Sequence, residues 1–208
     1  MQITAIILSG GRATRMSGVD KGLMHLHQKP LIQHVIDRLI PQVNEIIINA
    51  NRQITQYQAL GYVVHQDSTK DFLGPLAGIS LGLHYAKHDY ILTAPCDSPL
   101  LPLDLVQRLM IALIKNNAEI AVASSDSNTH PVFCLCKKNV LPSLTAYLEK
   151  GNRRVITWQK SLNYIEVDFS DCADAFINLN TLEELAQRSE EHTLNSSHSR
   201  ASRMPSSA

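Results

Sequence analysis

The chain has 208 residues, of which 44% are hydrophobic and 18% are charged. These values are typical of a globular protein, and the length suits one domain of generous size rather than two domains with a linker. Nineteen basic residues balance nineteen acidic ones. This balance argues against a dedicated nucleic-acid binder or a protein of anionic membranes, which would normally carry a large basic excess. A small anionic ligand needs only a few local cations and is not excluded.

The amino-terminal residues and the cysteines indicate a cytoplasmic protein. The apolar run at 3–8 lacks the basic start and the length of a signal peptide. No run approaches the roughly 20 apolar residues of a membrane span. The four cysteines form no Cys-x-x-Cys pair and have no matched histidine spacing. We therefore expect buried free thiols in a reducing compartment, at Cys96, Cys134, Cys136 and Cys172.

Short apolar runs rich in β-branched residues, bounded by Gly, Asn or Pro, predict buried parallel strands. Between the runs, apolar residues recur at helical spacing behind three prolines, and a proline in the first turn of a helix costs no hydrogen bond. The order β-α-β-α-β-α-β-α-β predicts a three-layer α/β sandwich with a mostly parallel central sheet and right-handed crossovers. The strands are expected at 3–8, 45–48, 62–65, 90–94 and 120–123, and the prolines are Pro30, Pro75 and Pro102.

Beyond residue 124 the pattern becomes looser. Thr181 and Glu184 have the spacing of a capping box and predict a last helix that begins at Thr181. No linker composition interrupts the chain before the last residues, so we interpret 1–187 as a single domain. The other expected elements are a strand at 132–136, a helix at 140–149, a helix after Gly151, a strand at 163–167 and a short apolar run at 176–179.

The segment 188–208 is rich in serine and has only two sizeable apolar side chains, Leu194 and Met204. Such a segment buries too little apolar surface to offset the entropy lost on ordering. Its back-translation also resembles a short-read sequencing adapter. We therefore interpret 188–208 as a disordered, non-native tail.

The loop after the first strand combines glycines with cations. Ligands of an open parallel sheet bind beyond the carboxyl ends of its strands. Glycine N–H groups can wrap phosphate oxygens there, while Arg12, Arg15 and Lys21 supply charge-assisted contacts. A lone Gly-Gly pair is more often a solvated loop, but three cations beside it favour phosphate binding. The chain has neither a Gly-Lys dipeptide nor G-x-G-x-x-G spacing, which excludes a Walker A loop and a dinucleotide fingerprint.

Asp97 directly follows the strand expected at 90–94 and lies between Pro95 and Pro99. A carboxylate fixed at the carboxyl end of a strand suits Mg²⁺, which takes few protein oxygens and shares itself with substrate phosphates. For Asp97 alone, a turn-capping role is equally open. The combination of Asp97 with the Gly-Gly-Arg loop favours the metal-binding role over the turn-capping role.

Six motifs occur together in this sequence. They are Leu-Ser-Gly-Gly-x-x-x-Arg-Met-x-Gly-x-x-Lys at 8–21, Lys-Pro-Leu at 29–31, Asn-Ala-Asn-Arg at 49–52, Gly-Pro-Leu-Ala-Gly at 74–78, Pro-Cys-Asp at 95–97 and Asn-Leu-Asn-Thr at 178–181. Their combination closely resembles the molybdenum cofactor guanylyltransferase family, from the first strand to about Gln187. The Gly-Gly-Arg loop alone would indicate only the wider nucleotidyltransferase superfamily.

The resemblance implies a Rossmann-like nucleotidyltransferase fold and the transfer of GMP from GTP to the phosphate of molybdopterin or molybdenum-molybdopterin, with release of pyrophosphate. It also implies Mg²⁺ as cofactor, with other cofactor-biosynthesis proteins or apo-molybdoenzyme chaperones as partners, and neither nucleic acid nor membrane. Guanine offers N–H donors, so acceptors suit its site. The implied catalytic residues are Arg15, Lys21 and Asp97, of which Asp97 would hold the metal. The implied GTP site is Leu8, Ser9, Gly10, Gly11, Lys21, Asn49, Asp67 and Asp97, and the implied pterin site is Asn178, Asn180, Arg153 and Arg154.

Three alternatives stay open. A cytidylyltransferase of the same fold would share the chemistry, although the motifs at 49–52 and 178–181 favour the guanylyl interpretation. A non-catalytic nucleotide-binding module would need neither Lys21 nor Asp97. A nicotinamide-dependent reductase would need the glycine fingerprint that this chain lacks.

Overall fold

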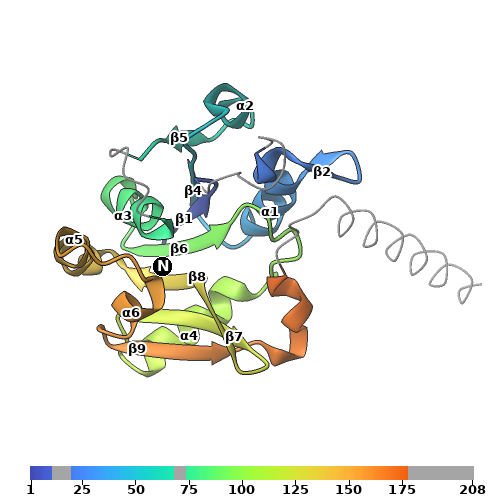
Figure 1. Ribbon diagram of the computed structural model, residues 1–208. Coiled ribbons are helices and arrows are strands. Elements are labelled where there is room, and N and C mark those ends of the chain that lie inside the picture. Colours follow the sequence, from blue (N-terminus) through green and yellow to red (C-terminus); the bar gives the residue numbers. More distant parts are fainter. Residues whose placement is uncertain (11–19, 68–73, 178–208) are drawn as a thin grey trace, which may run out of the picture.

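The computed structural model describes residues 1–10, 20–67 and 74–177 (Figure 1). In this part of the chain the central sheet has seven strands in the order β5-β4-β1-β6-β8-β7-β9. Neighbouring strands are parallel except at β8, which is antiparallel to both β6 and β7. The strands are β1 (Ile3–Leu8), β4 (Glu45–Asn49), β5 (Val63–His65), β6 (Tyr90–Pro95), β7 (Ile120–Ser125), β8 (Asn128–Lys137) and β9 (Tyr164–Asp168), with β2 (His25–Leu26) and β3 (Lys29–Pro30) in a separate small hairpin.

Helices pack on both faces of the sheet. Successive β1 side chains point to opposite faces, so that Ile6 enters one apolar cluster whereas Ala5 and Ile7 enter the other. The α-helices are α1 (Leu31–Leu39), α2 (Ile54–Gln58), α3 (Pro75–Tyr85), α4 (Leu105–Lys115), α5 (Leu141–Glu149) and α6 (Val155–Gln159). Side chains of α3, α5 and α6 join Ile6, and those of α1, α2 and α4 join Ile7 (Figure 1). The predicted three-layer α/β sandwich with a mostly parallel sheet is confirmed.

A small residue sets how closely α3 approaches the sheet. A Cβ atom on Gly82 would lie 2.4 Å from Cγ1 of Ile6, which is fully buried. Because that distance is far shorter than any ordinary contact, only glycine lets the helix lie this close to β1.

The prediction that three helices use a proline in their first turn is wrong for two of them. Pro75 does lie in the first turn of α3. Pro30 has an extended ψ of 143° and precedes α1, and α4 begins only at Leu105, behind Asp104 rather than Pro102. Pro142 takes the first-turn position in α5 instead. The helices themselves follow the predicted apolar periodicity.

The strand predicted at 132–136 is longer, because β8 begins in a tight hairpin with β7 and then passes through an irregularity beside Val122 and Ala123. The helices expected at 140–149 and after Gly151 are α5 and α6, and the strand expected at 163–167 is β9. The 3₁₀ helices η1 (Lys21–Leu23), η2 (Lys138–Val140) and η3 (Ser170–Phe176) were not predicted. The helix expected from Thr181 lies outside the described residues, and so does the segment 188–208, which was interpreted as a disordered tail.

The cysteines are free thiols, and three of them, Cys96, Cys134 and Cys136, are buried, while Cys172 is half-buried. None of the helices in the described ranges is long and apolar enough to cross a membrane.

Candidate active site

The carboxyl ends of neighbouring parallel strands meet at one edge of the sheet. In the register, Leu8 at the end of β1 pairs with Asn49 of β4 on one side and with Pro95 of β6 on the other. Asn49 in turn pairs with His65 of β5. The segments that follow these strands therefore start side by side, which is where ligands of this sheet type bind. The candidate residues on them come together from distant parts of the sequence.

Asn49 and Asp67 form the first part of the site. The side-chain amide of Asn49, only 2% exposed, donates from Nδ2 to Oδ1 of Asp67 at 2.9 Å. Asn51 donates from Nδ2 to Oδ2 of Asp67 at 2.7 Å, and its Oδ1 accepts from the backbone N–H of Asp67 at 2.9 Å. These bonds join the segments after β4 and β5 and fix the carboxylate. Asn49 Oδ1 and the Asp67 carboxylate oxygens are hydrogen-bond acceptors by their chemistry.

Two glycines make room for the Asn49 amide. A Cβ atom on Gly78, in α3, would lie 2.3 Å from Asn49 Oδ1 and 2.6 Å from Cδ2 of Leu8. A Cβ atom on Gly10 would lie 3.1 Å from the same Asn49 oxygen and 3.1 Å from Asn51 Nδ2. The backbone of β1 and the helix α3 thus approach the amide from two sides. The backbone N–H of Ser9 completes this side with a 2.8 Å hydrogen bond to the Asn49 carbonyl.

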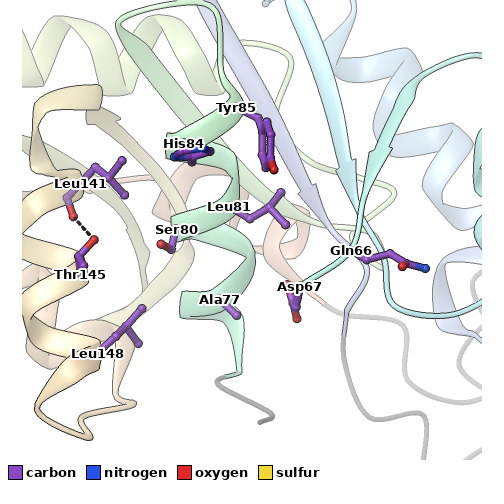
Figure 2. Close-up of a pocket in the computed structure, with 10 residues that line it drawn as sticks. All are labelled: Gln66, Asp67, Ala77, Ser80, Leu81, His84, Tyr85, Leu141, Thr145 and Leu148. Atoms are coloured by element: carbon purple, nitrogen blue, oxygen red, sulfur yellow. Dashed lines mark hydrogen bonds between the residues drawn. The ribbon is translucent and has the colours of Figure 1, made fainter. Parts of the chain in front are cut away.

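A cavity of about 400 Å³ adjoins this part of the site. Figure 2 shows Asp67 and Ala77 together at the amino-terminal end of α3, while His84 and Tyr85 lie toward the other end of that helix. On the far side, the wall comes from Leu141, Thr145 and Leu148 of α5. The cavity thus leads from the fixed Asp67 carboxylate along the outer face of α3.

Lys21 and Asp97 form the second part of the site. Lys21 Nζ lies 3.5 Å from Oδ2 of Asp97, and the two side chains are 35% and 9% exposed. Burial raises the pKa of Asp97, although the Lys21 ammonium and hydrogen bonds partly oppose this. Additional positive charge nearby would stabilise the ionised form of this buried carboxylate. Lys21 reaches Asp97 from η1, which the side chain of Asp20 caps by accepting from the N–H of Gly22.

The donor chemistry at Asp97 fits a magnesium ion. Mg²⁺ binds through one or two carboxylates and completes its shell with water and substrate phosphates. Within the described ranges, no group of three or more His, Cys, Asp or Glu side chains is arranged around a common point. The single Asp97 carboxylate fits a metal that takes most of its ligands from water and substrate phosphates.

The remaining predicted site residues fall into two groups. Arg153 and Arg154 are exposed in the turn between α5 and α6. Arg153 Nη1 donates to the carbonyls of Leu148 and Asn152 at 3.0 Å and 2.6 Å, so its guanidinium is held against the end of α5 rather than beside Lys21 or Asn49. Five predicted residues lie outside the described residues: Gly11, Arg12, Arg15, Asn178 and Asn180.

Comparison with known proteins places this chain in a family. Residues 5–162 match the family described as "MobA-like NTP transferase domain". The molybdenum cofactor guanylyltransferase of Polynucleobacter asymbioticus is 52% identical over 187 residues, which cover 88% of this chain and 94% of that protein. The chain belongs to the molybdenum cofactor guanylyltransferase family. The guanylyltransferase of Shewanella putrefaciens is 48% identical over 187 residues, covering 90% of this chain and 96% of that protein. The resemblance stated from the motifs is thereby confirmed.

A solved structure agrees with this molybdenum cofactor guanylyltransferase fold. Molybdopterin-guanine dinucleotide biosynthesis protein A from Archaeoglobus fulgidus superimposes with a TM-score of 0.74, over 92% of this chain and 99% of that one, at 21% identity. At that identity the likeness concerns the fold alone. It supports the α/β architecture with a mostly parallel sheet that was predicted from the order of elements.

Sequence reasoning missed four residues that shape this guanylyltransferase site. Asn51 and Gly78 lie within motifs already noted, at 49–52 and 74–78, but no role followed from the motifs themselves. Asp20 and Tyr57 had no sequence signal, because their hydrogen bond joins positions 37 residues apart.

Proposed function

We propose that this protein transfers GMP from GTP to the terminal phosphate of molybdopterin or molybdenum-molybdopterin. The observation that carries the proposal is the convergence of Asn49, Asp67, Lys21 and Asp97 at one edge of the sheet, in a chain about half identical to curated guanylyltransferases. A phosphate oxygen of the pterin attacks the α-phosphorus of GTP and forms a new P–O bond. The bond from that phosphorus to the bridging oxygen breaks, and pyrophosphate leaves with the electron pair.

The residues divide this work by their chemistry. Asn49 Oδ1 and Asp67 present acceptors, which match the N1–H and the exocyclic amine of guanine. The glycine loop that begins with Leu8, Ser9, Gly10 and Gly11 is proposed to wrap the triphosphate, with Lys21 and Arg15 neutralising charge that develops on it. On the acceptor side, Asn178, Asn180, Arg153 and Arg154 are proposed to bind the pterin and its phosphate. The reaction needs no protein nucleophile, so catalysis consists chiefly of positioning and charge neutralisation.

We propose Mg²⁺ as the metal, held by Asp97. When bound there, it would neutralise the triphosphate and the leaving pyrophosphate. The support is the buried Asp97 carboxylate beside Lys21. Burial raises the pKa of Asp97, and a bound cation would stabilise its ionised form.

We also propose that the protein works in the cytoplasm, which its free thiols support, since such thiols persist in reducing compartments. Other cofactor-biosynthesis proteins or apo-molybdoenzyme chaperones are the proposed recipients of its product. They would take up the guanylylated cofactor that the proposed reaction makes.

The function is tested by parallel assays with α-labelled GTP, CTP and ATP, each with and without molybdopterin and with and without Mg²⁺. We expect a labelled pterin dinucleotide only from GTP, in the presence of both molybdopterin and metal. Equal incorporation from CTP would overturn the guanosine assignment while leaving the fold intact. Binding of GTP without any transfer would instead support a non-catalytic module.

A further inference from the structure

The buried contact between Tyr57 and Asp20 lies directly beside Lys21 in the chain. Tyr57 is fully buried and Asp20 is 8% exposed. The Tyr57 hydroxyl donates to Oδ1 of Asp20 at 2.5 Å, and the same oxygen accepts from the backbone N–H of Gly22 at 3.3 Å. Lys21 is the residue between Asp20 and Gly22. The Asp20 carboxylate therefore fixes the backbone on both sides of the proposed phosphate-binding lysine.

The same hydroxyl also lies close to the segment that carries Asp97. A Cβ atom on Gly22 would lie 2.7 Å from Oη of Tyr57 and 3.1 Å from Sγ of Cys96. Cys96 immediately precedes Asp97 and is itself buried. Gly22 is thus packed between the tyrosine from α2 and the cysteine after β6. The Tyr57 hydroxyl therefore lies against the Gly22 backbone next to Lys21, and Gly22 in turn lies against the residue that precedes Asp97.

The choice of tyrosine rather than phenylalanine has a chemical reason. A buried carboxylate needs hydrogen-bond donors, and one that loses a donor is left with an unmet acceptor in a low-dielectric environment. A phenol that donates to a carboxylate forms a short charge-assisted bond of the kind seen here. Burial, helped by this hydrogen bond, raises the pKa of Tyr57 and keeps its proton on the phenol.

We propose that Tyr57 is a positioning residue, which acts through the Asp20 carboxylate to hold Lys21 at its working distance from Asp97. This inference rests on the function proposed above for Lys21 and Asp97. The alternative is that Tyr57 only fills space beneath α2. The two differ in what the hydroxyl does, because phenylalanine fills almost the same volume.

The test compares Tyr57→Phe with a matched control, Tyr164→Phe. Tyr164 also donates to a carboxylate, that of Glu166, at 2.5 Å. Tyr164, however, lies on the edge strand β9 and is only half-buried. We measure kcat, the KM for GTP, the Mg²⁺ concentration for half-maximal rate, and amide hydrogen exchange across 20–24 in the protein without nucleotide or metal. For Tyr57→Phe we expect kcat to fall by about tenfold or more with a smaller change in KM, because misplacing a charge-stabilising group acts mainly on the transition state.

We further expect a several-fold higher Mg²⁺ requirement and faster exchange at the Gly22 amide in Tyr57→Phe, with Tyr164→Phe equal to the unmodified protein in all these measurements. A second variant, Asp20→Asn, keeps the side-chain shape and is expected to shift the same measurements in the same direction. The proposal is overturned if folded Tyr57→Phe has a lower Tm but unchanged kcat and exchange. If the unmodified protein transfers no GMP, the proposed function fails, whereas the exchange measurement still decides whether Tyr57 holds the backbone around Lys21.

Discussion

Replacing Gly78 by alanine should weaken GTP binding by displacing the Asn49 amide, which we propose meets the guanine base. The new Cβ atom would lie 2.3 Å from Asn49 Oδ1, so the amide has to move. Movement breaks its 2.9 Å bond to Asp67 and shifts an acceptor that we propose meets guanine. The matched control is Gly82→Ala, one turn further along α3, where the new methyl group meets the apolar side chain of Ile6 at 2.4 Å.

The magnitudes follow from these contacts. Overpacking costs about 1–3 kcal/mol, and alanine recovers about 1 kcal/mol over glycine within a helix, so either variant should lose about 0–2 kcal/mol of unfolding free energy by these two terms. Only Gly78→Ala also disturbs a polar contact of the binding site. A lost hydrogen bond of this kind is worth about 1–3 kcal/mol, which corresponds to roughly a 5- to 150-fold rise in the Kd for GTP.

Calorimetric titration with GTP gives the Kd, and denaturant unfolding of both variants gives the loss of stability. We expect both variants to be destabilised, but only Gly78→Ala to bind GTP more weakly, with Gly82→Ala within about twofold of the parent, since additive effects are the rule for groups that share no partner. The reasoning is refuted if the two alanine variants bind GTP equally well, because Asn49 would then not depend on the space beside it.

Three further outcomes are expected. Asp97→Asn should lower kcat by a factor on the order of 10²–10³ with a smaller effect on GTP binding. Lys21→Ala should instead lower kcat and weaken GTP binding. Normal turnover of Asp97→Asn at limiting Mg²⁺ would show that Asp97 only caps a turn. Burial alone would raise the pKa of Glu45, but hydrogen bonds from Thr4 and Lys87 and the Lys87 ammonium outweigh it and lower that pKa below the ordinary 4.5. The stability that Glu45 contributes is therefore present above pH 4.5 and lost as the pH falls through its lowered pKa. Glu45→Gln should remove this part of the loss of stability in acid, measured as the free energy of unfolding against pH. An unchanged pH profile of the variant would contradict this. Deleting 188–208 should leave Tm and turnover unchanged because that segment offers little apolar surface, and a clear fall in Tm would show that it docks.

The elements that were predicted well are those whose signal is local. β1 and β4 are continuous apolar runs with β-branched residues, and burial on both faces requires that pattern. By contrast, α2 has only five residues, too few to display a helical period, and its start at Ile54 follows Gln53 in the left-handed region with φ of 47°. Proline was an unreliable guide because it also suits the extended residue before a helix, as at Pro30.

The candidate site was predictable to the extent that strand ends determine it. Once β1, β4 and β6 are placed in a parallel sheet, Leu8, Asn49 and Asp97 must gather at one edge. The supporting contacts were not predictable, because they depend on how helices pack against that edge. Tyr57 of α2 bonds to Asp20 across 37 positions, and no local pattern in the sequence encodes this contact.

The antiparallel strand β8 has a consequence for how the chain is synthesised and folded. The four parallel strands from β5 to β6 are complete when residue 95 has left the ribosome, yet one side of β6 has no partner until β8, at Asn128–Lys137, has been made. During that interval an apolar strand presents open N–H and C=O groups, a template for pairing with other chains. Because β8 forms a hairpin with the preceding strand β7, it can close that edge as soon as it emerges, bringing β7 with it.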